Sequence, residues 1–224
     1  EDFYNSVTER TAANAAALEL DVMEYMADAQ NRQALLQDVI PDILRSLRRS
    51  GATSCFIMLE NETHASKKDA VYLRDFNPSD APDDNADLMT EAGPSELLYD
   101  YGLTLSSMWT TYLDAGKDCT FYQTAFDGGN RYTDIPAMEL GYFSAPVRIH
   151  PDDRPCITYT IPLLDENHRS YGVIGFDMTL DYLKKLLPNQ DITLDEYGCY
   201  YLGITEDFTT AENILVVNDD YYDT

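Results

Sequence analysis

Apolar residues recur at three- and four-residue spacings over the first fifty positions of the chain. Between Phe3 and Gln30, where Ala, Leu, Glu and Met dominate, this spacing predicts one long helix. A second stripe, from Leu35 to Leu47, predicts further helix that Pro41 either kinks or enters in its first turn. Gly51 suits the end of this helical region. The stripe near the start of the chain faces either the core of the domain or a second copy of the chain.

The hydrophobic period shortens from about 3.6 residues to about 2 after Gly51. Short apolar runs at 55–59 and 70–73, separated by the polar stretch 60–69, predict an antiparallel pair of strands. The stretch 77–85 is rich in Pro and Asp and predicts a surface loop.

We expect the middle of the chain, residues 88–113, to be helical in pieces, with breaks at the Gly93-Pro94 pair and at Gly102. The residues that follow are rich in aromatic and β-branched side chains, which favour strands. The predicted strands cover 119–126, 141–149, 155–164 and 171–177, with a hairpin turn at 165–170.

A short amphipathic helix is predicted at 179–187, capped by Thr179 and stopped by Pro188. Helix first and then mostly antiparallel strands is the order of an α+β fold, not of an alternating βαβ fold. Two strand-like runs remain, at 199–204 and 214–217. Because two strands rarely stand alone, these either extend the first sheet or begin a second domain.

The chain is strongly acidic: 40 Asp and Glu face 15 Lys and Arg, and the formal net charge is -25. This charge repels phosphate backbones and anionic lipid headgroups, and it excludes a nucleic-acid partner. With 44% hydrophobic residues the chain is nevertheless a folded domain. It contains no apolar run of the ~20 residues that span a bilayer. The abrupt start at Glu1 suits a piece of a longer protein, which can carry a membrane span elsewhere.

Sequence signatures of catalysis are missing. The chain lacks the nucleophile elbow, the dinucleotide fingerprint, the phosphate-binding loop and the zinc-protease motif. The three histidines, His64, His150 and His168, lie in predicted turns beside polar residues. General-base chemistry would therefore rest on carboxylates, and the sequence marks no pair of them beside an apolar pocket. We expect no enzymatic activity.

The strongest candidate for a metal site is an acidic loop, in which Asp83, Asn85 and Asp87 occupy the first, third and fifth places of a calcium-loop pattern. Leu88 stands where that loop needs glycine, and Pro94 stands where it needs a bidentate glutamate. A solvated acidic loop therefore accounts better for these residues. The four cysteines form no C-x-x-C pair, so a zinc knuckle is disfavoured and their redox state stays open. We expect no metal and no cofactor.

Tyrosines are abundant, 17 against 1 tryptophan. A tyrosine offers an apolar ring with a hydroxyl group, which suits pockets for small polar ligands. Equally, tyrosines pack the faces and edges of a sheet.

An ordered set of motifs in the second half of the chain resembles the double Cache family of sensor domains. The motifs are Leu140–Pro146 (LGYFSAP), Ile157–Leu163 (ITYTIPL), Tyr171–Asp177 (YGVIGFD) and Leu180–Leu183 (LDYL). With the N-terminal helix and the two strands after it, the resemblance covers about residues 1 to 187. It implies a PAS-like antiparallel sheet in the extracytoplasmic part of a bacterial membrane receptor, typically a histidine kinase, a chemoreceptor or a diguanylate cyclase.

The resemblance implies three parts: an N-terminal helical stalk at 1–50, a membrane-distal module at 51–187 and a partial membrane-proximal module at 188–224. It also implies sensing of a small molecule outside the cytoplasm by a membrane-anchored parent. If the apolar stripe near the start of the chain is partly exposed, a homodimer would form through the N-terminal helix. The alternative function is a secreted acidic binding or hydrolytic domain with no signalling role.

Amino-acid-binding members of the family carry an Arg-x-Trp-Tyr-x-x-Ala segment, then Tyr-x-Asp, then the Asp of the GVxGxD strand. In this chain Tyr122, Ala125, Tyr142 and Asp177 match, whereas Cys119 replaces the arginine, Phe121 the tryptophan and Ser144 the aspartate. Without the arginine, a carboxylate ligand loses hydrogen bonds worth about 1.5 to 3 kcal/mol, so an α-amino acid bound in the usual way is disfavoured. The resemblance implies a site for a small amine- or hydroxyl-bearing ligand. Its residues would be Phe121, Tyr122, Tyr142, Ser144 and Asp177.

The strand period adds a condition to this site. Tyr142 and Ser144 are two residues apart and point to one face of a sheet, whereas Phe143 points to the other. Phe121 and Tyr122 are adjacent, so only one of them would point inward from a regular strand. Asp177 would be the only full charge in the site, and it would accept a ligand's ammonium, cap the helix that follows, or do both.

Overall fold

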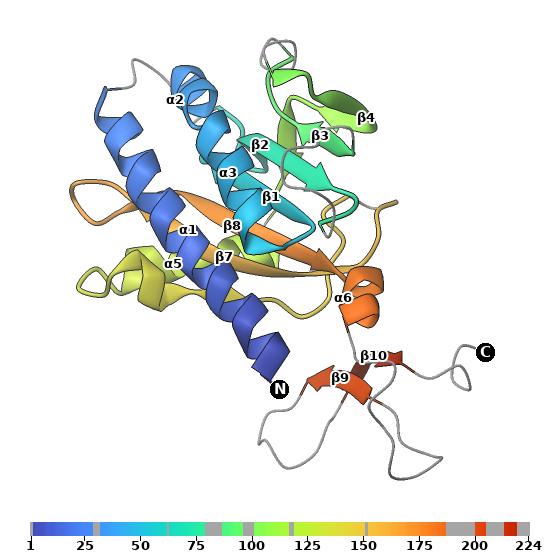
Figure 1. The fold of residues 1–224 in the computed structure, drawn as a ribbon. Helices are drawn as coiled ribbons and strands as arrows, with labels where there is room; N and C mark the ends of the chain where they lie inside the picture. The colour runs from blue at the N-terminus through green and yellow to red at the C-terminus, as the bar shows by residue number, and fades with distance from the viewer. Residues whose placement is uncertain are drawn as a thin grey trace, which may run out of the picture. The chain divides into compact units, whose positions relative to one another are not determined.

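The computed structural model of the protein describes residues 2–28, 32–61, 63–78, 87–95, 101–116, 119–150, 152–186, 200–204 and 213–218. These residues divide into two units, and Figure 1 shows their helices and strands. The first unit comprises Glu1–Ser144 and Thr158–Asp177, and the second comprises Ala145–Ile157 and Met178–Thr224. The fold class is α+β, as the sequence predicts.

Three helices precede the first strand: α1 (Asp2–Asp28), α2 (Arg32–Asp38) and α3 (Ile40–Ser50). The long N-terminal helix is confirmed, and its predicted end at Gln30 lies outside the described residues. Pro41 stands in the first turn of α3, where the missing N–H costs nothing. Gly51 ends α3 in the left-handed conformation at φ 69, which glycine adopts without strain.

The helical stripe predicted near the start of the chain is buried where its side chains are described. Ala15, Leu18 and Val22 on α1 are 0% exposed. Leu20, on another side of the same helix, is 65% exposed. These three side chains therefore belong to the core of the first unit, where α1 packs along α3 (Figure 1).

The main sheet has eight strands in the order β4-β3-β2-β1-β8-β7-β6, with β5 paired to β2. Their bounds are β1 (Ser54–Leu59), β2 (Lys67–Asp75), β3 (Leu88–Ala92), β4 (Thr104–Thr110), β5 (Tyr112–Asp114), β6 (Tyr142–Phe143), β7 (Cys156–Leu164) and β8 (Ser170–Thr179). β1 is central, buried along its whole length, and antiparallel to both β2 and β8. β3 and β4 run parallel, so the sheet is mixed and not wholly antiparallel as expected.

Most of the described part of 88–113 is strand, although Tyr101 is helical. The strand residues form β3, β4 and most of β5. Of the two expected helix breaks, Gly93 instead follows β3, at φ 147, whereas Gly102 directly follows the helical Tyr101, at φ 66. Pairing with β2 overrides the local preference of this segment.

The predicted strand 119–126 is also wrong, because this segment begins helix α5 (Thr120–Arg131). Its buried residues Phe121, Tyr122, Ala125 and Gly129 recur at the spacing of one helix face. This helical spacing includes Gly129, which lies beyond the predicted end of the strand at residue 126. The predicted strand 141–149 shrinks to β6, followed by a single bridge from Val147 to Cys156.

The second unit contains α6 (Leu180–Leu186), β9 (Tyr200–Ile204) and β10 (Asn213–Asn218). The predicted cap is confirmed, since the Tyr182 N–H donates to Thr179 Oγ1 at 3.3 Å. β9 and β10 pair with each other in a two-stranded sheet separate from the main sheet, and β10 lies against α6. The domain boundaries expected at 50 and 187 stay predictions.

Gly175 allows the aromatic packing at the centre of the sheet. It pairs with Phe56, and a Cβ added to it would lie 2.1 Å from the Phe56 ring. We predict that Gly175→Ala lowers the free energy of unfolding by about 1–3 kcal/mol, because the ring must move. Urea denaturation measures this change.

Gly128→Ala is the matched control, because a Cβ at this helical glycine meets nothing within 4 Å. We expect it to stabilise the protein by about 0.5–1 kcal/mol. Equal effects of the two substitutions would contradict the packing assigned to Gly175.

Glu19 on α1 is 8% exposed, and burial raises the pKa of its carboxyl group above the ordinary value of 4.5. A raised pKa means that the folded protein binds a proton at Glu19 more tightly than the unfolded chain does. Ionisation of this buried carboxyl group, as the pH rises through the raised pKa, therefore lowers the stability of the fold. We therefore predict that Glu19→Gln raises the stability at pH 7, and that the gain shrinks as the pH falls towards 4.5. Glu9→Gln, at an exposed position of the same helix, is the control. A gain that is independent of pH would contradict this account.

Candidate functional site

Asp177 is a carboxylate with 0% exposure on β8. Thr53 Oγ1 donates to its Oδ1 at 2.8 Å, and the Tyr72 hydroxyl donates to its Oδ2 at 2.7 Å. Each carboxylate oxygen thus has a donor, as an ionised group without water requires. Asp177 was expected to bind a ligand's ammonium, to cap α6, or both. The observed side-chain cap of α6 is Thr179.

The donor Tyr72 connects Asp177 to two further buried charges. Arg74 Nη2 donates to the Tyr72 hydroxyl at 2.6 Å, and Arg74 Nη1 lies 3.4 Å from Glu91 Oε1. Arg74 is 5% exposed and Glu91 is 1% exposed. Asp177 is therefore not the only full charge in this region, and that expectation is wrong.

Strand register places these groups on one face of the sheet. Ser54 on β1 pairs with Arg74 on one side and with Asp177 on the other. Residues paired across antiparallel strands point to the same face, and Tyr72 shares it because it lies two positions from Arg74. We call this the Asp177 face.

The alternation predicted for β6 is observed. Tyr142 pairs with Thr160 of β7, and Phe143 pairs with Tyr159. The rings of Phe143 and Tyr159 contact each other with centroids 4.6 Å apart. Tyr142 and Phe143 therefore point to opposite faces of the sheet.

Helix α5 shows which of these faces is the Asp177 face. The Phe121 ring contacts that of Phe56, a residue of the Asp177 face, with centroids 5.7 Å apart. Thr160 Oγ1 donates to the Phe121 carbonyl at 2.9 Å, so Thr160 points to the same side. Tyr142, which pairs with Thr160, therefore shares the face of Asp177.

Ser144 joins β6 to β7 through its backbone and its side chain. Its N–H donates to the Thr158 carbonyl at 2.8 Å, and its hydroxyl accepts from the Thr158 N–H at 3.0 Å. The hydroxyl of Thr158 itself, like that of Ser54, is fully buried and has no hydrogen-bond partner among the described residues. Thr158 lies two positions from Thr160, so both unpaired hydroxyls belong to the Asp177 face.

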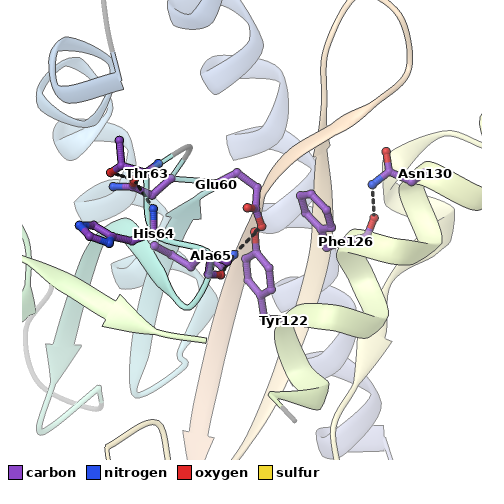
Figure 2. Close-up of polar contacts among 9 residues, drawn as sticks. Glu60, Thr63, His64, Ala65, Tyr122, Phe126 and Asn130 are labelled. Carbon is purple, nitrogen blue, oxygen red and sulfur yellow. Dashed lines mark hydrogen bonds and ion pairs between the residues drawn. The ribbon is translucent and has the colours of Figure 1, made fainter. Parts of the chain in front are cut away.

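Tyr122 points to a different cluster, at the turn between β1 and β2 (Figure 2). Its hydroxyl donates to Glu60 Oε1 at 2.5 Å, and Lys68 Nζ donates to the same oxygen at 2.6 Å. The ring of Tyr122 stacks on that of Phe126 at 5.4 Å. Burial and the hydrogen bond to Glu60 raise the pKa of Tyr122, so its hydroxyl keeps its proton. This cluster fixes the first turns of α5 and thereby places Phe121 beside Phe56.

Cys119 precedes α5, at the position where the amino-acid-binding pattern has arginine. Burial raises the pKa of its thiol to about 11, so this position carries a neutral group at pH 7. Cys119, Cys55 and Cys156 form no disulfide among the described residues. Cys199 lies outside the described residues.

No group of three or more His, Cys, Asp and Glu in the described ranges is placed to hold a metal ion. Asp83 and Asn85 of the predicted acidic loop lie outside those ranges. No helix in the part of the chain that the structure describes is long and apolar enough to cross a membrane.

Sequence reasoning missed Thr53, Tyr72, Arg74 and Glu91. A signal was present for two of them, since Tyr72 and Arg74 alternate with apolar residues in a predicted strand region and so mark a polar stripe on one face. Nothing local marks Glu91, which reads as an ordinary surface carboxylate.

Comparisons with known proteins found similar solved structures only. No family model matches the chain, and no curated protein matches it. The ligand-binding domain of the Campylobacter jejuni chemoreceptor Tlp3, in complex with 4-methylisoleucine, is 13% identical, with a TM-score of 0.47 over 96% of this chain and 73% of that one.

Two other structures are similar to the same degree. The periplasmic sensory domain of the Campylobacter jejuni chemoreceptor Tlp1 is 11% identical, with a TM-score of 0.47 over 94% of this chain and 71% of that one. The extracellular domain of the candidate histidine kinase mmHK1S-Z3 is 14% identical, with a TM-score of 0.44 over 97% of this chain and 71% of that one. These neighbours are sensory domains that lie outside the cytoplasm. At such identities the likeness assigns no ligand to the residues of this chain.

We predict that Tyr72→Phe lowers the free energy of unfolding by about 2–4 kcal/mol, because it removes a donor from the buried Asp177 and an acceptor from Arg74. Urea denaturation at pH 7 measures the loss. Tyr132→Phe, at a side chain that is 48% exposed, is the control and should change stability by less than about 0.5 kcal/mol. Equal effects of the two variants would show that the Tyr72 hydroxyl does not hold the network together.

Proposed function

We propose that this chain is the extracytoplasmic small-molecule sensing part of a membrane signal-transduction receptor, and that the Asp177 face holds its ligand. The output of the parent would be that of a histidine kinase, a diguanylate cyclase or a chemoreceptor. The chain itself would bind its ligand without turnover.

One observation carries this proposal. Two fully buried hydroxyls without a described partner, those of Ser54 and Thr158, share one face with the buried carboxylate of Asp177. Buried polar groups in folded proteins nearly always have partners, and an unpaired one costs about 1–3 kcal/mol. A ligand with donors and acceptors would supply the missing partners.

The segments that carry the family resemblance also support the proposal. LGYFSAP contains β6, ITYTIPL lies within β7, and YGVIGFD lies within β8. These three strands are neighbours in the sheet. Residues separated in sequence by turns and loops thus meet on the face that carries Tyr142, Thr160 and Asp177.

The chemistry of this face favours a small amine- or hydroxyl-bearing ligand. Cys119 is a neutral thiol, so the cation that would hold a carboxylate is missing from this position. Asp177 accepts hydrogen bonds, and the two free hydroxyls both donate and accept.

Signal transmission in this proposal follows from the placement of the strands. A ligand that binds one arrangement of β7, β8 and β1 better than another shifts the population towards that arrangement. β8 continues directly into α6, and α1 begins the chain. Anchoring of the parent in a membrane and pairing of two chains along α1, on which Leu20 is 65% exposed, belong to the same proposal.

The alternative is a secreted acidic binding or hydrolytic domain without signalling. Membrane-spanning segments and a cytoplasmic output domain in the parent gene would favour the receptor. Hydrolysis of ester, glycoside or phosphate substrates that disappears when one carboxylate is changed would favour the alternative.

A thermal-shift screen of amines, amino acids, organic acids and sugars tests the proposed function. We predict that an amine- or hydroxyl-bearing compound stabilises the protein by about 2.7 kcal/mol at a hundredfold excess over Kd, which corresponds to a shift of about 5–10 °C. Thr158→Val should abolish most of this shift without lowering the melting temperature of the free protein, because the Thr158 hydroxyl bonds to no described residue.

Thr124→Val, at an exposed position of α5, is the control and should keep the shift. Asp177→Asn, like Thr158→Val, should reduce the ligand-induced shift in melting temperature. A ligand that binds Thr158→Val and Asp177→Asn as tightly as the unchanged protein would refute the assignment of the site.

A further inference from the structure

Glu91 lies at a β-bulge in β3. Tyr72 pairs with Ala92, whereas the next residue, Leu73, pairs with Thr90. Glu91 is therefore the extra residue of the bulge, and it leaves the regular alternation of side chains. Bulges turn side chains in this way, often beside functional sites.

The carboxylate that the bulge presents is only partly satisfied. Glu91 Oε1 lies 3.4 Å from Arg74 Nη1, longer than the ~2.7–2.9 Å of a strong charge-assisted hydrogen bond. Glu91 Oε2 has no hydrogen-bond partner among the described residues, although the side chain is 1% exposed. A buried carboxylate oxygen of this kind calls for a donor.

Ser54 lies between this carboxylate and Asp177. The four strands β3, β2, β1 and β8 are consecutive in the sheet, and they carry Glu91, Arg74, Ser54 and Asp177 respectively. The Ser54 side chain is 0% exposed, and its hydroxyl has no hydrogen-bond partner among the described residues. Two groups of this row thus have no partner among the described residues. Glu91 Oε2 can only accept a hydrogen bond, whereas the Ser54 hydroxyl can donate and accept.

The charges in this row do not cancel. In their ionised forms, Glu91 and Asp177 each carry one negative charge, and Arg74 carries one positive charge. Buried charges are stable when they are compensated. A ligand with one positive charge would balance the row, whereas a second positive charge would face Arg74.

We propose that Glu91 is a second ligand contact, and that the ligand is a monocation with an ammonium group at Asp177 and an uncharged hydroxyl at its other end. That hydroxyl donates to Glu91 Oε2 and accepts from Ser54, which a second ammonium group cannot do. The proposal rests on the proposed function, and it narrows the ligand class to amino alcohols.

Four six-carbon probes test the proposal by isothermal titration calorimetry on the whole chain: aminohexanol, hexylamine, diaminohexane and hexanediol. We expect aminohexanol to bind about tenfold more tightly than each of the others, the effect of one hydrogen bond to a charged group. Diaminohexane that binds as tightly as aminohexanol would overturn the charge argument.

Variants locate the contact. Glu91→Met should reduce the affinity for aminohexanol to that for hexylamine, so that the tenfold difference disappears. Ser54→Ala should do the same, and it keeps the test valid if Glu91→Met fails to fold, because the Ser54 hydroxyl bonds to no described group. Thr90→Val is the matched control. It removes a buried, unpaired hydroxyl from a neighbouring residue that pairs with Leu73 on the opposite face, and it should leave the difference intact.

Failure of this inference differs from failure of the proposed function. If Asp177→Asn weakens hexylamine and aminohexanol equally, and Ser54→Ala changes neither, the sensing site stands and the contact at Glu91 is refuted. If none of the four probes binds, the amino alcohol is refuted, and the wider thermal-shift screen decides on the sensing function.

Discussion

Burial of the Asp177 carboxylate is the constraint on which the rest of the site depends. An ionised carboxylate without water costs several kcal/mol unless donors replace its hydration. The fold supplies two donors from distant parts of the chain, Thr53 before β1 and Tyr72 in β2. Both donors reach Asp177 only when β8, β1 and β2 pair in the observed register. The hydrogen bonds of one side chain thus favour a single alignment of three strands, and a shift by one residue would turn Asp177 to the other face.

The same requirement extends outward through Tyr72. A phenol hydroxyl has one proton, and Tyr72 gives it to Asp177, so Arg74 must be the donor in their contact. The buried guanidinium of Arg74 needs an anion in turn, which Glu91 provides from the bulge of β3. This chain of requirements explains why charged side chains occupy strands that otherwise read as core. It also gives the Asp177 face a rigid arrangement of donors and acceptors before any ligand binds.

Periodicity predicted the fold class, the N-terminal helix, the central strands and the alternation around Tyr142, because each depends on residues close in sequence. It failed in the strand segments within 88–113 and at 119–126, where pairing with β2 and the packing of Phe121 on Phe56 decide the structure. For the site, the family resemblance marked Asp177, at the end of the YGVIGFD motif. Local pattern could not mark Glu91, since an extra residue in a bulge is defined only by the register of the partner strand. Tyr122 was expected beside Asp177, but its hydroxyl bonds to Glu60.

Selectivity at such a site would come from what is left unpaired as much as from what is bound. The hydroxyls of Ser54 and Thr158, which have no partner in the described part of the chain, destabilise the free protein, and the core of the first unit offsets this cost. A ligand that pairs with them recovers the cost. An analogue without the matching group leaves these hydroxyls buried and without a partner. Its loss of affinity is therefore larger than the loss from removing one hydrogen bond to a solvent-exposed group. An apolar replacement of these residues would therefore favour folding and weaken discrimination. Retaining polar side chains in the middle of a sheet is consistent with a face shaped for recognition and not for stability alone.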